Sequence, residues 1–344
     1  MALPAVTPLR FALAARWALW ALVAIVITGA SVRLTGSGLG CSDWPNCEPG
    51  EFVPAADFHG WVEFGNRIVT GLVSVAVALA VGASLWRQPR RTDLVWWSIA
   101  LVAGVAFQIG LGAVTVLTHL SPPIVMSHFL ASQVLIAAAV VLCYRANAEE
   151  RPLGRGVAVS SRGLQAHAWV IAMLLCAALW TGTVVTGTGP HGGDEHVQRL
   201  DYAMASVARV HGITVAVMAG LTLLLAARAR RLARSERNRA DATEVARRVR
   251  NVIAVMAAQA AIGYVQYFNE LPVLLVAIHV AGATLLTIAV TRLVLAAATR
   301  PRAMEFETSE TTDPPTDPPT DPPTDAPTDA PTDAVVIVAP GFAE

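Results

Sequence analysis

Eight stretches of the chain contain neither acidic nor basic residues, and each is close to the length of a membrane-spanning helix. They lie at about residues 17–32, 68–86, 94–118, 124–144, 168–190, 210–227, 252–269 and 271–291. About 20 apolar residues cross the hydrocarbon core as a helix, which satisfies every backbone hydrogen bond internally. Only 15% of the 344 residues are charged, against about 25% in a globular domain. The chain is therefore predicted to be an all-α integral membrane protein with eight transmembrane helices.

The basic residues, all of them arginine, are distributed unevenly among the connections between these stretches. Of the 25 arginines, 21 lie before the first stretch, after the last, or in the second, fourth and sixth connections. The positive-inside rule assigns this side to the cytoplasm. We therefore expect a multi-pass protein of a bacterial cell membrane, in contact with membrane lipids and with both termini in the cytoplasm. The net charge of zero and the absence of a basic patch argue against binding to nucleic acid.

The two halves of the membrane part are similar in sequence. Residues 108–128, QIGLGAVTVLTHLSPPIVMSH, align without a gap with residues 259–279, QAAIGYVQYFNELPVLLVAIH, at an offset of 151. An even number of helices in each half gives both halves the same orientation, so the duplication is parallel. We predict two tandem four-helix bundles, residues 1–150 and 151–302. Residues 303–344, which contain ten acids and repeat Thr-Asp-Pro-Pro, are predicted to be a disordered tail.

Three histidines lie inside the predicted helices, where ionisable residues are rare and usually functional. His128, His211 and His279 each lie within about two turns, or roughly 10 Å, of the outer face. His128 and His279 also occupy equivalent positions of the repeat. A neutral imidazole is the commonest metal ligand, and single histidines on separate apolar helices fit the axial ligation of a haem. The alternative is a polar side chain that is hydrogen-bonded within the bundle.

The residues around these histidines fit a haem better than another metal. The sequence contains no HExxH motif, no Cys/His cluster and no carboxylate set, which argues against zinc and di-iron sites. Arg209, two residues before His211, is a candidate partner for a haem propionate, or else an arginine that reaches the membrane interface. Gly112, Gly263 and Gly282 would allow a macrocycle or a neighbouring helix to approach closely.

Further polar residues lie at the entrance of the second helix. Glu63 and Arg67 are four residues apart, with Asn66 on nearly the same face and His59 one turn before Glu63. The pair either stabilises the start of the helix or presents Glu63 to an outer pocket, where it accepts or delivers protons. Both roles remain open on the sequence.

Two cysteines lie in the first outer loop, in the segment GCSDWPNCEPG. An oxidising compartment and the Trp-Pro turn between Cys41 and Cys47 favour a disulfide. The alternative is a redox-active pair of thiols.

Taken together, these motifs resemble those of a known family. TGSGLGCSDWPNC, EFGNR, GAVTVLTHLSPPIVMSH and the second-half histidines make the chain similar to haem A synthase over about residues 12–297. That family oxidises a ring methyl of haem O to a formyl group, which gives haem A for cytochrome c oxidase. The resemblance implies a site for the substrate haem O in the first half and a haem b in the second. The implied partners are haem O, the haem O synthase that makes it, and the assembly machinery of cytochrome c oxidase.

The resemblance also implies roles for residues singled out above. Glu63 matches the catalytic carboxylate, and His128 matches a ligand of the substrate haem. The haem b ligands are matched by His211 and His279. The cysteines match the family's outer-loop pair.

One position departs from the family pattern. The glutamate motif commonly continues with a histidine three residues later, where this chain has Asn66. An amide oxygen is a weak haem ligand, so we expect a first-half haem with His128 as its one firm ligand and an open or weakly held opposite face. His59 would replace Asn66 only if the chain before Glu63 left the helix. With Arg67, these residues complete the candidate first-half haem site.

Two other functions compete with this interpretation. A non-catalytic haem b protein acting in oxidase assembly or electron transfer would have lost the oxidation in its first half. A small-solute transporter also uses duplicated halves, but the sequence lacks Pro/Gly-broken central helices with charges at the midplane. Extraction of haems from cells with and without the chain distinguishes the enzyme from the non-catalytic protein.

Overall fold

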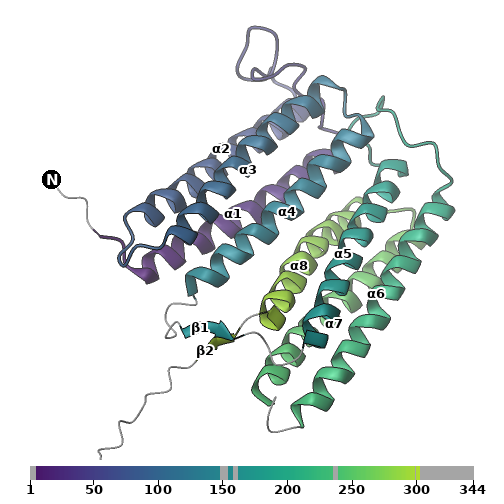
Figure 1. The fold of residues 1–344 in the computed structure, drawn as a ribbon. Helices are drawn as coiled ribbons and strands as arrows, with labels where there is room; N and C mark the ends of the chain where they lie inside the picture. The colour runs from purple at the N-terminus through teal and green to yellow at the C-terminus, as the bar shows by residue number, and fades with distance from the viewer. Residues whose placement is uncertain (1–4, 148–153, 158–161, 235–238, 299, 303–344) are drawn as a thin grey trace, which may run out of the picture. The chain divides into compact units, whose positions relative to one another are not determined.

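Eight helices of the computed structural model are long and apolar enough to cross a membrane, which confirms the predicted number (Figure 1). The structure describes residues 5–147, 154–157, 162–234, 239–298 and 300–302. The helices are α1 (Pro8–Leu34), α2 (Phe58–Leu85), α3 (Thr92–Leu117), α4 (Pro122–Asn147), α5 (Arg162–Thr188), α6 (Met204–Ala233), α7 (Arg239–Phe268) and α8 (Val273–Ala298).

The helix ends reflect local capping and propensity rather than the limits of the uncharged stretches. Thr7 caps α1 by accepting a hydrogen bond from the backbone of Arg10, and Asp57 caps α2 by accepting one from Gly60. α6 and α7 continue beyond the apolar stretches into arginine-rich sequence, because arginine is a good helix former outside the hydrocarbon region.

Each half forms its own four-helix bundle. In the first half, each of α1 to α4 packs against two neighbours, and α5 to α8 repeat this arrangement in the second half. Phe11 and Ile136 belong to one cluster of buried apolar side chains, to which α8 adds only Ile288. Ile171 and Leu293 belong to a second cluster, confined to α5–α8. The predicted tandem pair of four-helix bundles is confirmed.

The duplication is also visible in the backbone. The turn between α3 and α4 holds His119 and Leu120 at φ values of 49° and 58°, and the turn between α7 and α8 holds Glu270 and Leu271 at 61° and 59°. Non-glycine residues seldom adopt this left-handed conformation. In both turns the N–H of the leucine donates to the carbonyl five residues earlier, at 2.9 and 2.8 Å. The same uncommon turn therefore recurs at the sequence offset of 151.

The two halves meet along a seam where α4 packs against α8. At this seam the buried side chain of Gln133 donates from Nε2 to Thr284 Oγ1 at 3.2 Å and accepts at Oε1 from Thr287 Oγ1 at 2.9 Å. Gln133 and Thr284 are 151 residues apart. Positions that are equivalent in the repeat thus contact each other, which places this seam on the pseudo-two-fold axis that relates the halves.

A short antiparallel pair of strands adds to the helices. β1 (Gly154–Val157) pairs with β2 (Arg300–Arg302), with Gly154 opposite Arg302 and Val157 opposite Arg300. The sequence analysis did not anticipate this pair, because both strands lie outside the apolar stretches and are distant in the chain.

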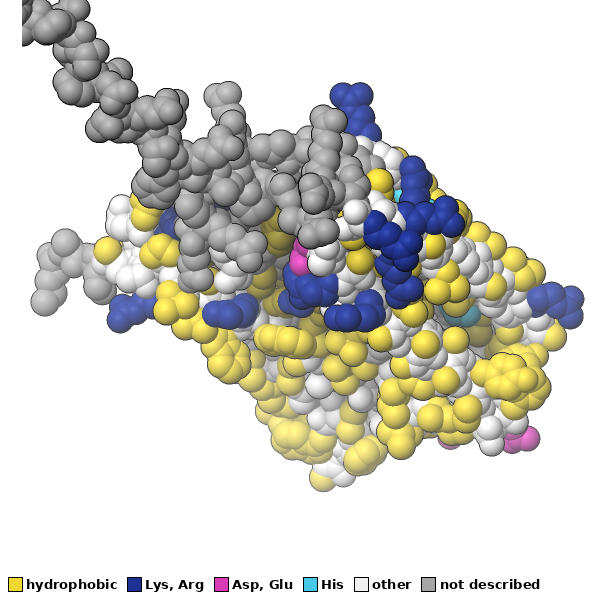
Figure 2. Space-filling model, turned by 90° about the horizontal axis from the view of Figure 1, so that it is seen from below, with side chains coloured by type: hydrophobic (Ala, Val, Ile, Leu, Met, Phe, Trp, Pro, Cys, Tyr) yellow, Lys and Arg dark blue, Asp and Glu magenta, His cyan; other side chains and the backbone are white. Residues whose placement is uncertain are grey.

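Arginine side chains gather at the end of the helices seen in Figure 2, whereas the sides of the helices are largely hydrophobic. At the start of α3, Asp93 forms ion pairs with Arg91 at 2.6 Å and with Arg145 at 3.2 Å. Which side of the membrane this end faces stays a prediction. The predicted tail, residues 303–344, lies outside the described residues.

Candidate functional site

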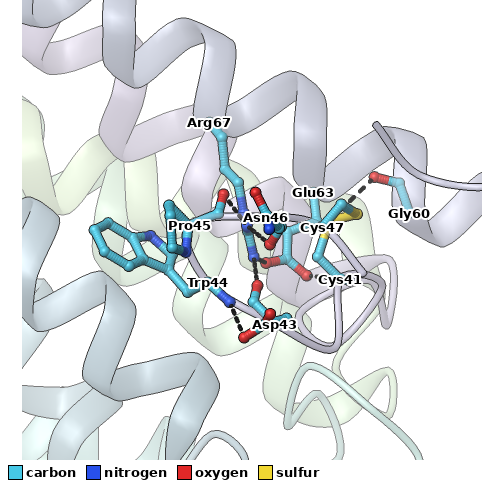
Figure 3. Close-up of polar contacts among 9 residues, drawn as sticks. All are labelled: Cys41, Asp43, Trp44, Pro45, Asn46, Cys47, Gly60, Glu63 and Arg67. Carbon is cyan, nitrogen blue, oxygen red and sulfur yellow. Dashed lines mark hydrogen bonds and ion pairs between the residues drawn. A yellow bond between two sulfur atoms is a disulfide. The ribbon is translucent and has the colours of Figure 1, made fainter. Parts of the chain in front are cut away.

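A disulfide between Cys41 and Cys47 closes the loop that follows α1, as expected, and this segment is called the cysteine loop (Figure 3). The adjoining chain packs so closely on the start of α2 that a Cβ atom at Gly40 would overlap the backbone of His59 and Gly60. Only glycine permits this approach. The loop marks one end of the helices, here called the cysteine-loop end.

An ion pair on α2 holds the cysteine loop in place (Figure 3). The buried carboxylate of Glu63 accepts a hydrogen bond from the backbone of Cys41 at 2.8 Å and pairs with Arg67 at 2.6 Å. Arg67 donates to the carbonyl oxygens of Asp43 at 3.1 Å and Asn46 at 2.8 Å. Both carboxylate oxygens of Glu63 therefore have partners, and Arg67 binds the loop.

The polar residues expected at the entrance of α2 point to different neighbours. Glu63 and Arg67 contact the cysteine loop, whereas Asn66 accepts a hydrogen bond from Thr28 of α1 at 2.9 Å. His59 lies in the first turn of α2, and its Nδ1 contacts Ser37 Oγ at 2.9 Å. Because α2 begins at Phe58 and runs unbroken, His59 lies about 10 Å along the axis from Asn66. The chain before Glu63 does not leave the helix, so the condition under which His59 would replace Asn66 as a haem ligand is not met.

In the first half, His128 and Asn66 are held by two separate sets of contacts. His128 of α4 packs against Gly112 of α3, whose ideal Cβ position lies 3.6 Å from its Cε1. Gln108, one turn before Gly112, donates to the carbonyl oxygen of His128 at 3.1 Å. Asn66 of α2 is held by Thr28 of α1. His128 Nδ1 is buried and has no hydrogen-bond partner among the described residues.

The second half places the corresponding helices around two histidines. His279 of α8 packs against Gly263 of α7, and His211 of α6 packs against Gly182 of α5, with 3.2 Å between each ideal Cβ position and the nearest imidazole atom. His211 and His279 lie close enough to interact electrostatically. Thr181 contacts His211 Nδ1 at 3.1 Å. The structure thus brings together the two histidines that the sequence predicted as a pair.

A Thr-Gly pair at the same place in α1 and α5 relates the two groups. Thr28-Gly29 faces Asn66, and Thr181-Gly182 faces His211. Asn66 therefore occupies in the first half the position that His211 occupies in the second. The sequence analysis missed these pairs, although TGASVRLTG and TGTVVTGTG in α1 and α5 carry the same Thr-Gly spacing and would have revealed them.

The contact with Thr181 is compatible with one tautomer of His211 in particular. When the single proton of the Thr181 hydroxyl is donated to the carbonyl oxygen of Ala177 at 2.9 Å or of Ala178 at 3.2 Å, its oxygen is available to accept from Nδ1–H of His211. A neutral imidazole protonated at Nδ1 keeps its lone pair on Nε2, which is the form that binds a metal.

The remaining predicted residues have simpler surroundings. Arg209 is exposed on α6. Gly282 accommodates the side chain of Gln259, which would overlap a Cβ atom there. Within the described ranges, no group of three or more His, Cys, Asp or Glu residues gathers as a metal-ion site. Paired histidines are the remaining candidates for ligation.

Comparison with known proteins gives the same family as the motifs. The family model described as "Cytochrome oxidase assembly protein" (COX15-CtaA) matches residues 15–59 and 51–291. A "Heme A synthase" of Symbiobacterium thermophilum is 33% identical over 173 residues, 48% of this chain and 55% of that protein. Another, of Geobacillus kaustophilus, is 35% identical over 106 residues, 30% and 32% of the two chains.

These alignments span between about a third and about half the length of the curated relatives. The family model, by contrast, covers most of the chain, including both groups of residues described above. The chain belongs to the COX15-CtaA family of cytochrome oxidase assembly proteins, the family of haem A synthase.

Proposed function

We propose that the protein is a haem A synthase, an oxidoreductase that converts a ring methyl of haem O into a formyl group. The observation that carries this proposal is the pair of equivalent but unequal groups. The second half carries His211 and His279, and the first half carries His128 and, at the position equivalent to His211, Asn66. Two similar halves with different candidate ligands suit a protein that uses one haem as a cofactor and another as its substrate.

The residues of the second half fit a haem with two histidine ligands. His211 and His279 come from different helices and lie within electrostatic range of each other. Glycines at positions 182 and 263 leave room beside each ring. His279 Nδ1 is buried without a hydrogen-bond partner among the described side chains and backbone. A buried polar atom without a partner is costly, so the observation supports a bound group at this place.

In the proposed mechanism, the two halves perform different tasks. When bound, haem b would supply a one-electron carrier. His211 and His279 would hold it, and Thr181 would support the tautomer of His211 that carries its proton on Nδ1. α4 and α8, which carry His128 and His279, pack against each other at the seam. This packing supports a short path for electrons between the two halves.

The first half is proposed to bind the substrate haem O through His128. The Asn66 amide oxygen already accepts a hydrogen bond from Thr28, which reduces its capacity to bind iron. The chain would therefore offer His128 as the one firm ligand of the substrate. A weakly held iron would leave room for oxygen chemistry.

Glu63 is proposed to handle protons near the substrate as well as to hold the cysteine loop. Its contacts with Cys41 and Arg67 fix the carboxylate at the entrance of α2, three residues before Asn66. A positioned carboxylate is suited to accept or deliver a proton. The loop role is a direct consequence of the contacts, and the proton role rests on the resemblance to the family.

The cysteine-loop end is proposed to face away from the cytoplasm, with both termini inside. The arginines concentrated at the opposite end support this orientation by the positive-inside rule. A disulfide at the cysteine-loop end is consistent with an oxidising compartment. The proposed partners are a haem O synthase as the source of substrate and the oxidase assembly machinery as the recipient of haem A.

Extraction of haems from cells with and without the chain tests this function. We expect haem A only in cells that contain the protein together with haem O. In purified protein, His211→Ala and His279→Ala are each expected to lose a low-spin haem b spectrum, whereas His128→Ala retains it. Unchanged haem A in cells without the chain, together with bound haem b in the protein, would instead identify the non-catalytic haem protein.

A further inference from the structure

Arg33 lies near the end of α1 and reaches from the first half to the second. Its Nη2 donates to the carbonyl oxygen of Thr186 in α5 at 2.8 Å. Its side chain packs on the backbone of Gly193, in the loop between α5 and α6, where an ideal Cβ would lie 3.5 Å from Arg33 Cγ. This half-buried guanidinium therefore lies between α1 and α5, at the cysteine-loop end.

No acidic group compensates the charge of Arg33 within the described part of the chain. Its Nε is buried without a hydrogen-bond partner there, and it forms no ion pair. The neighbouring charged residue is Arg199, which has the same sign: it donates to the carbonyl oxygen of Gly189 at 2.7 Å, and the N–H of Gly189 donates at 3.3 Å to the Thr186 carbonyl that Arg33 binds. Asp194, in the same loop, accepts a hydrogen bond from the backbone of His196.

A cation in these surroundings requires an anion or a functional explanation. Burial of a charge without a partner is strongly unfavourable. Ionisable residues in membrane helices usually mark functional sites. Two neighbouring arginines without a carboxylate form a site that is suited to a carboxylate or phosphate, which the planar guanidinium binds through paired hydrogen bonds.

The place of this site along the helices points to the proposed haem b. Thr186 follows Thr181 by five residues in α5, so it lies about 7.5 Å nearer the cysteine-loop end than the residue that contacts His211. Arg199 belongs to the loop that leads from α5 to α6, the helix that carries His211. Both cations thus lie beside the second half, between its histidines and the cysteine-loop end.

We propose that Arg33 and Arg199 form a carboxylate site that takes a propionate group of the haem held by His211 and His279. This inference rests on the proposed function. A haem carries two propionates on one edge of the ring, and two arginines supply the complementary charge. Arg199 is exposed, as is Arg209, the propionate partner suggested by the sequence; Arg199 is preferred because it is hydrogen-bonded to the chain beside Thr186, which Arg33 binds.

Esterified haem tests the site, because haem b dimethyl ester lacks both carboxylates but keeps the iron and the ring. Detergent-solubilised protein from haem-deficient cells is titrated with haem b and with the diester, and the low-spin spectrum is recorded. Wild-type protein is expected to bind haem b about tenfold to hundredfold more tightly than the diester, as charge-assisted hydrogen bonds predict. In Arg33→Gln this preference falls at least tenfold, while the affinity for the diester stays the same.

Arg199→Gln is expected to reduce the preference as well, and Arg33→Lys to retain part of it. Arg10→Gln, an exposed arginine at the opposite end, is the matched control and keeps the wild-type preference. Equal weakening of haem b and diester binding by Arg33→Gln would mean a packing role and overturn the proposal. So would a preference that depends on Arg209 instead.

Further outcomes distinguish a lipid phosphate from a haem propionate, and a failure of the arginine site from a failure of the proposed function. If vesicles of phosphatidylglycerol abolish the preference of the wild type, a lipid phosphate occupies the arginines and the propionate assignment is wrong. If the wild type binds both compounds equally with a low-spin spectrum, only the arginine site is overturned. If neither compound binds, the proposed function is overturned together with the arginine site.

Discussion

Thr28 and Thr181 occupy equivalent positions in α1 and α5, yet the side chain that each contacts differs. Thr28 donates to the Asn66 amide oxygen, whereas Thr181 contacts Nδ1 of the His211 imidazole. The surroundings are otherwise alike, since a glycine follows each threonine and leaves room beside the partner residue. The difference between the two proposed haem sites therefore depends on one side chain rather than on a different backbone.

A histidine at position 66 should enter the place that Thr28 and Gly29 already provide. The ideal Cβ of Gly29 lies 4.0 Å from Asn66 Nδ2, and the missing side chain of Gly29 allows a larger ring to approach α1 there, as Gly182 does for His211. We expect Asn66→His, loaded with haem O, to convert a high-spin spectrum to a low-spin one and to lose haem A production. His59→Ala, the control, leaves the high-spin spectrum unchanged. A high-spin spectrum that persists in Asn66→His would contradict the equivalence of positions 66 and 211.

Thr181 should tune the proposed haem b through His211. Thr181→Val keeps the shape of the side chain but removes the acceptor for Nδ1–H, which makes the imidazole a weaker electron donor. We expect a retained low-spin spectrum with a more positive midpoint potential, restored by Thr181→Ser and measured by redox titration. Thr183→Val, which removes a buried hydroxyl bonded to the carbonyl of Trp180, is the matched control. An unchanged potential in Thr181→Val would rule out this role.

The helices are the elements that sequence predicts best, because charge-free length alone identifies a membrane span. The positions of the histidines along α4, α6 and α8 follow from the same reasoning and from the repeat. The rotation of each helix about its axis does not follow from the sequence. This rotation places Glu63 against the cysteine loop and Asn66 against α1. Contacts of Arg33 with α5 likewise depend on how the halves pack, which the sequence pattern does not encode.

The ion pair on α2 gives Glu63 a structural task that separate substitutions distinguish from its proposed proton transfer. Glu63→Gln keeps an oxygen for the Cys41 N–H, so we expect an intact loop with reduced haem A in cell extracts. Glu63→Ala removes the link to Cys41 and Arg67 and should make the disulfide more accessible to reductant. Thiol labelling after mild reduction measures this. Normal haem A production by Glu63→Gln would exclude the proton role, and equal reduction rates in both variants would exclude the loop role.

At the scale of the whole molecule, the seam between α4 and α8 joins the halves through buried polar contacts as well as apolar packing. Gln133 contacts Thr284 and Thr287; Thr284 donates to the carbonyl oxygen of Val280, and the carbonyl oxygen of Ala283 lies within hydrogen-bond distance of the Thr287 hydroxyl as an alternative acceptor. The threonines are therefore not left without acceptors when Gln133 is replaced. The seam should tolerate an apolar residue at a moderate cost.

Gln133→Leu is expected to lower the free energy of unfolding by about 1–2 kcal/mol, the typical worth of the lost hydrogen bonds. The low-spin haem b spectrum should remain, because the histidines of the second half are unaffected. Denaturation in detergent followed by circular dichroism measures the change. Ser98→Ala, which removes a buried hydrogen bond within α3 only, is the control with a smaller effect. A wild-type stability in Gln133→Leu would show that apolar packing alone holds the seam.

The contact between Gln133 and Thr284 has a consequence for how such a protein diverges. In a symmetric dimer of identical four-helix chains, a residue on the two-fold axis would face its own copy. A single chain that contains both halves escapes this restriction, so a glutamine can face threonines across the axis. The same freedom lets one half keep two histidines while the other replaces one with asparagine. Gene fusion would thus have allowed specialisation that self-association forbids.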